Sequence, residues 1–353
     1  MKKLARCVGI AAAILATAAC ARDPGDNPAE EVATPQEVLV FGSVESIIQW
    51  LKDEQWWGEV TDAQLAGVPH VVITGIAPGW QKAAQEITVP EKKEIFYRLM
   101  LPLALRANEI VRDRRTRLEQ MAAAARQQSA LDAEDLEWLR QGSVSLRISS
   151  EEEAATLGSD MQQVLAVIEE ALYKLDEIPP GLLLGQAAYE SGYGTSRFAV
   201  EGNALFGQWT YGGEGMVPEN QRKKLGDHRI ASYEWPFDSV RGYFINISSH
   251  PAYEDLRALR ARLKREGKDV TSLALADGLV RYSERGQAYV DTLKGIIRTN
   301  GLDRADTAAF RDEAMRFMFT ADNEAEAAEL REEIDELRRT GELESIVARM
   351  RLE

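Results

Sequence analysis

The stretch PPGLLLGQAAYESGYGTSRF, residues 179–198, constrains the fold of this chain more than any other. Its composition is that of a buried helix that begins at Pro180, because proline is favourable in a first helical turn. Gly192 and Gly194 then end the helix. Glu190 shares one helix face with the apolar residues three and seven positions before it. The sequence therefore predicts a buried helix with a single carboxylate near its end.

Glu190 has the surroundings of a general acid. A carboxyl group among apolar side chains is partly desolvated, which raises its pKa and favours the neutral acid near pH 7. We expect Gly192 and Gly194 to keep bulk away from this group, so that a substrate can approach it. The alternative is an exposed glutamate at the end of a glycine-capped helix, and this stretch alone does not decide between the two.

The amino terminus has the pattern of an export signal. Residues 1–20 combine a basic start with the apolar run VGIAAAILATAA, which is too short to span a bilayer. Cys20 follows small residues, as in bacterial lipoprotein signals, although Thr17 stands where leucine is usual. Cys7 lies inside the signal, which leaves Cys20 alone and makes a disulfide within the chain impossible. We expect an exported periplasmic protein, lipid-anchored to the outer membrane through Cys20. The alternative is ordinary cleavage ahead of Cys20 and release as a soluble protein.

After this signal, composition and periodicity divide the chain into four parts. We expect a flexible linker over residues 21–43 and an N-terminal helical region over 44–150. Residues 151–301 contain Glu190, and the resemblance described below implies that they are the catalytic domain. An acidic helical tail that could dock a protein partner is expected over 302–353. The β-branched run 71–74 is expected to be extended.

Two breakers mark helices in these regions. Pro102 is expected to kink a long helix that starts near Pro90, and Gly142 to close a helix over residues 132–141. Residues 202–235 are rich in glycine and aromatic residues and lack a helical period, so they predict a small β-hairpin lobe. The fold class expected is therefore mainly α (α+β).

Several function classes are excluded by composition and motifs. The net charge of −15 and the pI near 4.9 argue against nucleic-acid binding, which needs a concentrated basic surface. The three histidines are scattered and form no His-x-x-x-His pair, so no metal site is expected. Neither a Walker loop, a dinucleotide fingerprint nor a Gly-x-Ser-x-Gly motif occurs, and we expect no cofactor.

Several motifs, in order along the chain, resemble the glycoside hydrolase family 73 glucosaminidases, and their Bax-type branch in particular. Residues 182–209, LLLGQAAYESGYGTSRFAVEGNALFGQW, look like the catalytic segment of that family. The upstream segments VPHVVITGIAPGW and KKEIFYRLMLPL and the downstream segments SVRGYFINISSHPAY and LVRYSERGQAYVDTLKGII are similar to those of the branch. The resemblance extends roughly over residues 67–300.

This resemblance implies a lysozyme-like helical fold with a small β lobe, and cleavage of the β-1,4 bond after N-acetylglucosamine in peptidoglycan. It implies that Glu190 is the general acid. Glycoside hydrolysis normally needs a second carboxylate, and relatives carry it in the β lobe. Glu219 is marginally favoured over Glu214, and Asp227 and Glu234 remain possible.

The same resemblance implies the remaining site residues. Tyr282 is expected beside the acid, where a phenol can hold a sugar hydroxyl or water. The expected substrate-binding residues are Tyr193, Asn203, Phe206, Trp209 and Tyr289. Tyr289 and Phe206 could equally be core residues.

Three functions are therefore in competition. The preferred one is an endo-β-N-acetylglucosaminidase acting on peptidoglycan. A lytic transglycosylase would use a single glutamate in a similar motif and leave 1,6-anhydromuramyl ends. A non-catalytic wall-binding scaffold lipoprotein would bind peptidoglycan without cleaving it.

Overall fold

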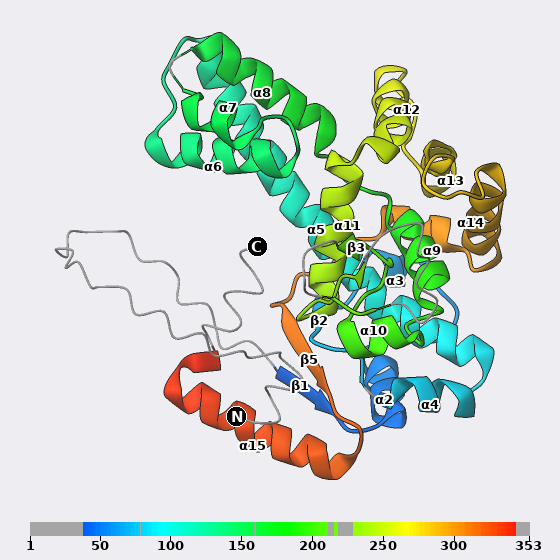
Figure 1. Cartoon of the computed structure of the whole chain (residues 1–353). Helices are drawn as coiled ribbons and strands as arrows, with labels where there is room; N and C mark the ends of the chain where they lie inside the picture. Colours follow the sequence, from blue (N-terminus) through cyan, green and yellow to red (C-terminus); the bar gives the residue numbers. More distant parts are fainter. Residues whose placement is uncertain (1–37, 78, 159, 211–214, 218–228, 344–353) are drawn as a thin grey trace.

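The computed structural model describes residues 38–343, except residues 78, 159, 211–214 and 218–228. This part of the chain is mainly helical, as the sequence predicts, with two small sheets (Figure 1). Its α-helices are α2 (Val44–Asp53), α3 (Asp62–Leu65), α4 (Trp80–Glu86), α5 (Val89–Arg126), α6 (Ala133–Ser145), α7 (Glu151–Thr156), α8 (Met161–Lys174), α9 (Pro180–Ser191), α10 (Arg197–Gly202), α11 (Pro236–Ser249), α12 (Glu254–Arg265), α13 (Ser272–Leu275), α14 (Gln287–Thr299) and α15 (Glu324–Thr340). The 3-10 turns are η2 (Pro251–Tyr253), η3 (Ala276–Leu279) and η4 (Leu302–Thr307). The strands are β1 (Val38–Phe41), β2 (Val71–Ile73), β3 (Trp209–Thr210), β4 (Arg229–Ile230) and β5 (Arg316–Thr320). None of the described helices combines the length and the apolarity needed to cross a membrane.

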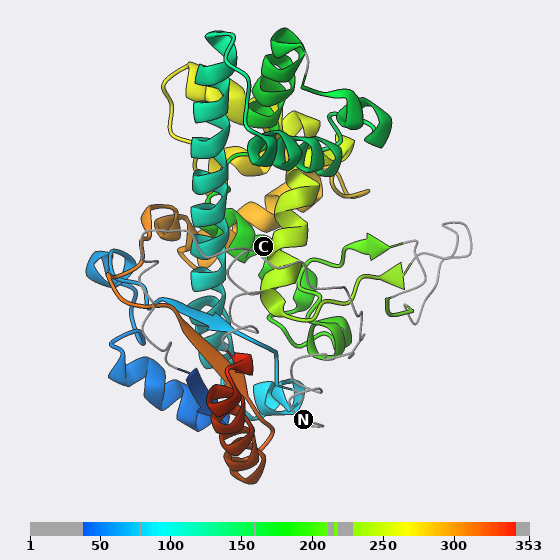
Figure 2. The same cartoon turned by 90° about the vertical axis from the view of Figure 1, so that its left-hand side faces the viewer.

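Helix α5 is a long central helix of 38 residues. Figure 2 shows it running from the sheet strands to the group of α6, α7 and α8. The side chain of Thr88 accepts a hydrogen bond from the amide of Glu91 and begins the helix, with Pro90 in the first turn. The helix continues without a break through Pro102, and the kink expected there stays a prediction. Likewise, α6 continues through Gly142 to Ser145, so the predicted end at Gly142 is wrong.

A three-stranded parallel sheet is the main feature that the sequence analysis missed. Strand β5 lies between β1 and β2, with Phe317 opposite both Val38 and Val72. The expectation of a flexible linker over residues 21–43 is therefore wrong for β1, and the expectation of a helical tail over 302–353 is wrong for β5. Burial explains the strand, because Phe317 is fully buried between its neighbours and satisfies its backbone groups in the sheet.

The rest of the tail is also part of the folded body. Helix α15 begins at the cap Asn323 and ends at Gly341, which has the left-handed conformation. Its apolar face is buried, and α15 contacts β1 (Figure 1).

The small β lobe follows α10 and is confirmed. Strands β3 and β4 are antiparallel, with Trp209 opposite Ile230. The lobe projects beside α11 (Figure 2). Helix α9 lies in the core between α5, α14 and η4.

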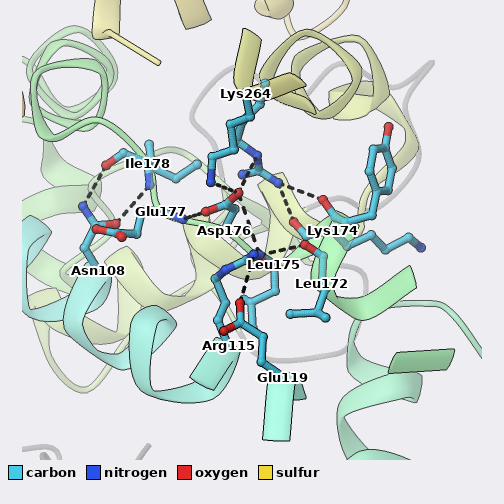
Figure 3. Close-up of polar contacts among 12 residues, drawn as sticks. Asn108, Arg115, Glu119, Leu172, Lys174, Leu175, Asp176, Glu177, Ile178 and Lys264 are labelled. Carbon is cyan, nitrogen blue, oxygen red and sulfur yellow. Dashed lines mark hydrogen bonds and ion pairs between the residues drawn. The ribbon is translucent and has the colours of Figure 1, made fainter. Parts of the chain in front are cut away.

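The connection from α8 to α9 is held by a buried ionic cluster around Asp176 (Figure 3). Lys264 donates to the Asp176 carboxylate, and the guanidiniums of Arg260 and Arg115 lie 3.7 and 3.8 Å from it. Arg115 also donates to the carbonyl oxygens of Leu172 and Leu175, at 2.7 and 2.6 Å.

One more contact fixes the last residues before α9. Asn108 of α5 exchanges two hydrogen bonds with the backbone of Ile178, at 2.9 and 3.0 Å. Together with the Asp176 cluster, this pair anchors the start of α9 to α5 and α12 (Figure 3).

Candidate active site

Helix α9 is buried along its length up to its last turn, as its sequence predicts. Residues 180–188 are all buried. Gly181 packs on η4 so closely that a Cβ there would lie 2.3 Å from the carbonyl oxygen of Leu302. A Cβ on Gly185 would lie 3.0 Å from side chains of Ile297 and Leu293 on α14. The glycines of this helix therefore allow its backbone to approach the neighbouring elements.

The turn after Glu190 is built by Ser191 and three residues with positive φ. The Ser191 hydroxyl donates to the carbonyl of Ala187 at 2.6 Å and accepts from the amide of Gly194 at 2.8 Å. Gly192, Tyr193 and Gly194 have φ of 59°, 61° and 73°. Gly192 is the left-handed cap that ends the helix, as predicted.

Gly194 does not do what we expected. A Cβ on it would meet the indole nitrogen of Trp80 at 3.4 Å and the ring of Phe96 at 3.6 Å. Its glycine therefore serves the turn and its packing on α4 and α5, and the expectation that it clears space around Glu190 is wrong.

The structure brings Glu190 together with Tyr282 and Tyr289. The Tyr289 hydroxyl donates to Glu190 Oε1 at 3.0 Å. The Tyr282 ring lies 5.1 Å from the Tyr289 ring, centre to centre. Burial raises the pKa of Glu190 above its ordinary value, and the hydroxyls of Tyr289 and Tyr282 oppose this rise only in part. The carboxyl group thus has the environment of a neutral acid.

Behind Tyr289 lies a buried polar chain. Gln186 Nε2 donates to the Tyr289 hydroxyl at 3.1 Å, and the Tyr243 hydroxyl donates to Gln186 Oε1 at 2.5 Å. Gln186 is fully buried, and Tyr243 is 2% exposed. Tyr253 adds a fourth ring to the group, 5.6 Å from Tyr282.

Two of the residues expected to bind substrate pack against other aromatic side chains. Phe206 is 3% exposed and stacks on Tyr243 at 4.3 Å, so it supports the tyrosine group as a core residue. Tyr193 packs its ring against Phe96 and Tyr97 of α5. Its carbonyl accepts from the indole of Trp80 at 3.1 Å.

Asn203 and Trp209 belong to the β lobe. Asn203 takes the left-handed conformation and donates to the carbonyls of Tyr233 and Glu234, at 3.2 and 2.9 Å. It thereby fastens the lobe to the end of α10. Trp209 on β3 is 50% exposed.

The expected second carboxylate stays a prediction. Glu214, Glu219 and Asp227 lie outside the described residues, as does Cys20. Glu234 is exposed. Within the described part of the chain, the groups that shift the pKa of Glu190 are tyrosine hydroxyls, and no three His, Cys, Asp or Glu side chains gather in a way that could hold a metal ion.

Sequence reasoning missed Gln186, Tyr243 and Tyr253. Gln186 precedes Glu190 by four residues and so shares its helix face, which was a usable signal. Tyr243 and Tyr253 both lie in the segment SVRGYFINISSHPAY, but nothing local distinguishes them from core tyrosines.

Comparison with known proteins places this site in a family. Residues 167–302, which contain Glu190 and all four tyrosines around it, match the glucosaminidase family described as mannosyl-glycoprotein endo-beta-N-acetylglucosaminidase. The chain is 33% identical over 129 residues to protein bax of Escherichia coli (strain K12), which covers 36% of this chain and 45% of that protein. The chain thus aligns with less than half of its curated relative. No solved structure matches the chain. Residues 167–302 therefore form a glucosaminidase domain, and over the matched part the chain is similar to a protein of the Bax type.

Proposed function

We propose that this protein is a peptidoglycan hydrolase of the endo-β-N-acetylglucosaminidase type, with Glu190 as its general acid. The glucosaminidase domain indicates a hydrolase acting on glycans. The single observation that carries the finer proposal is the raised pKa of Glu190, which burial produces at the end of α9 among tyrosine hydroxyls. A carboxyl group that stays protonated near neutral pH can deliver its proton to the oxygen of a leaving sugar.

The chemistry divides between Glu190 and groups on the β lobe. Protonation of the glycosidic oxygen by Glu190 breaks the bond to the anomeric carbon and leaves positive charge on that sugar. A second carboxylate, for which Glu219 and Glu214 are our candidates, would then stabilise this charge or activate water. Trp209, exposed on β3, offers an apolar ring face to a sugar of the glycan chain.

Three assignments are proposed on sequence alone. Residues 1–20 support export to the periplasm and attachment to the outer membrane through Cys20. Incorporation of labelled palmitate in the parent protein, and its loss in Cys20→Ala, is the result that this proposal requires. A protein partner for the acidic tail also stays a proposal.

The test of the activity is mass spectrometry of purified peptidoglycan fragments. The parent protein should release fragments with reducing N-acetylglucosamine ends, and Glu190→Gln should release none. Glu201→Gln is the matched control, because Glu201 is an exposed helix glutamate of the same segment that pairs only with Arg197 among the described residues. It should retain the parent activity.

Other products would lead to other conclusions. Anhydromuramyl ends would identify a lytic transglycosylase instead. Binding of the parent protein to the wall without release of fragments would identify a scaffold, and equal activity of Glu190→Gln and Glu201→Gln would remove Glu190 from the mechanism.

A further inference from the structure

Gln186 is a fully buried amide that contacts no solvent and lies between two tyrosine hydroxyls. We propose that Gln186 is a positioning residue, which acts through Tyr289 to make the Tyr289 hydroxyl a permanent donor to Glu190. This inference rests on the proposed function, because it concerns how the proposed acid is held.

The number of donors and acceptors fixes the direction of this series of hydrogen bonds. Tyr243 donates to the amide oxygen, the amide nitrogen donates to the Tyr289 oxygen, and Tyr289 donates to Glu190 Oε1. A tyrosine hydroxyl carries a single proton. Because Gln186 already supplies a donor to the Tyr289 oxygen, the Tyr289 proton is directed to the carboxyl group.

The reversed amide would not satisfy these groups. With the amide nitrogen turned to Tyr243, the proton of that buried hydroxyl would lose the acceptor it has in the structure. The amide oxygen would then compete with Glu190 for the proton of Tyr289. An unsatisfied buried hydroxyl is costly, so the observed direction is the stable one.

This direction selects which oxygen of Glu190 carries the acid proton. In a neutral carboxyl group the carbonyl oxygen accepts hydrogen bonds. Since Oε1 accepts from Tyr289, this arrangement favours the proton on Oε2, from which it can be delivered to a substrate. Gln186 therefore positions the acid proton without contacting the substrate.

The groups that face Glu190 are few, which makes the effect measurable. Among the residues that the structure describes, they are Tyr243 on α11, Tyr253 in η2, Tyr282 between η3 and α14, and Tyr289 on α14. All are neutral at physiological pH. Loss of the Tyr289 donor therefore removes stabilisation of the charged form of Glu190 and raises its pKa.

The test is an NMR titration of the full-length protein labelled with 13C at the glutamate carboxyl carbon. The Glu190 resonance is identified by its absence in Glu190→Gln. In Tyr289→Phe the pKa of Glu190 should rise by about one unit, the size of one hydrogen bond to a charged group. In Gln186→Met it should rise by less, because the Tyr289 hydroxyl remains but loses the amide that orients it. In a Tyr289→Phe background the same substitution should add nothing, because Gln186 acts through Tyr289.

Gln208→Met is the matched control. Gln208 Oε1 also accepts a tyrosine hydroxyl, from Tyr233 at 2.5 Å, but Gln208 makes no contact with Glu190 or Tyr289 among the described residues. Its substitution should leave the Glu190 titration unchanged. If Gln186→Met does not fold, Tyr243→Phe carries the test, since it removes the donor that holds the amide and should shift the pKa in the same direction by less.

Two results would overturn the inference. One is an unchanged Glu190 titration in Gln186→Met, or in Tyr243→Phe if only that variant folds. The other is an equal shift from Gln186→Met with and without Tyr289. Because the titration needs no catalysis, a parent protein that releases no glycan fragments would contradict the proposed function and leave this inference standing. In an active enzyme, the fall of kcat/KM at high pH should move upward with the pKa of Glu190.

Discussion

Replacement of Asp176 by asparagine should destabilise the protein strongly, although this residue is remote from the candidate active site. The Asp176 side chain is 9% exposed, and it holds the buried Arg260, whose side chain is 2% exposed. Burial lowers the pKa of Arg260 to about 10, which shows how far this guanidinium is removed from water. Asparagine keeps the shape of the side chain but removes the carboxylate charge that compensates Arg260.

The size of the destabilisation follows from how exposed the three basic side chains around Asp176 are. Removal of one partner from a buried ion pair costs about 3–5 kcal/mol. Lys264 and Arg115 are 50% and 22% exposed and can turn to solvent, so we take the lower value, about 3 kcal/mol. In a chain of 353 residues that corresponds to a fall in Tm of about 4 °C.

The adjacent residue is the control. Glu177 pairs with Arg112 at 2.6 Å, but the two side chains are 42% and 52% exposed. Glu177→Gln should therefore cost at most about 1 kcal/mol. Urea unfolding followed by circular dichroism at pH 7 measures both variants. Equal losses in the two variants, or a loss below about 1 kcal/mol in Asp176→Asn, would refute this account of the cluster.

The effect should also depend on pH. Burial alone would raise the pKa of Asp176, but Arg260, Lys264 and Arg115 together hold it below its ordinary value. A carboxylate with a lowered folded-state pKa stabilises the fold fully above its unfolded pKa of about 3.9 and loses this contribution as the pH falls through the folded pKa. The difference between the parent protein and Asp176→Asn should stay constant from pH 7 to 5 and shrink below pH 4.

Three further predictions test the site and its helix. Burial raises the pKa of Glu190, so the stabilising contribution of this residue is lost as the pH rises through its folded-state pKa. Glu190→Gln should therefore increase Tm relative to the parent protein at pH 8 but not at pH 4. Equal changes in Tm at both pH values would contradict this. Gly181→Ala should lower the free energy of unfolding by about 1–3 kcal/mol, because the new Cβ would lie 2.3 Å from the Leu302 carbonyl oxygen. The control Gly142→Ala, whose Cβ would have nothing within 4 Å, should stabilise α6 by about 0.5–1 kcal/mol in the same unfolding assay. Trp209→Ala should change stability by less than about 0.5 kcal/mol, because Trp209 is 50% exposed, yet lower kcat/KM on glycan several-fold; unchanged kinetics would exclude this ring from substrate binding.

Much of the local structure was predictable from the sequence. The apolar run before Glu190, its first-turn proline and its glycine cap predicted α9 closely, because these signals act over a few residues. The glycine-rich segment before α11 predicted the β lobe in the same way. The errors at Gly142 and in the tail show the limit of such signals. A single glycine lowers helix stability only modestly, and packing of α6 outweighs it.

The site was only half predictable. The helical spacing placed Glu190 on an apolar face, and its raised pKa agrees with that prediction. The expectation for Gly194 was wrong because the turn carries it to Trp80 and Phe96, on α4 and α5, which no local pattern reveals.

The sequence by itself determined where α9 begins and ends, and that a lone carboxylate stands at its end, since backbone conformation and capping depend on near neighbours. The tertiary structure alone decided which hydroxyls meet that carboxylate, because Tyr289 is 99 positions from Glu190 and Tyr243 is 57 from Gln186. It also decided that β1 and β5, from opposite ends of the described chain, share one sheet. Such pairings arise because apolar surface is buried most completely, and most buried polar groups find a partner, in only one arrangement of the whole chain.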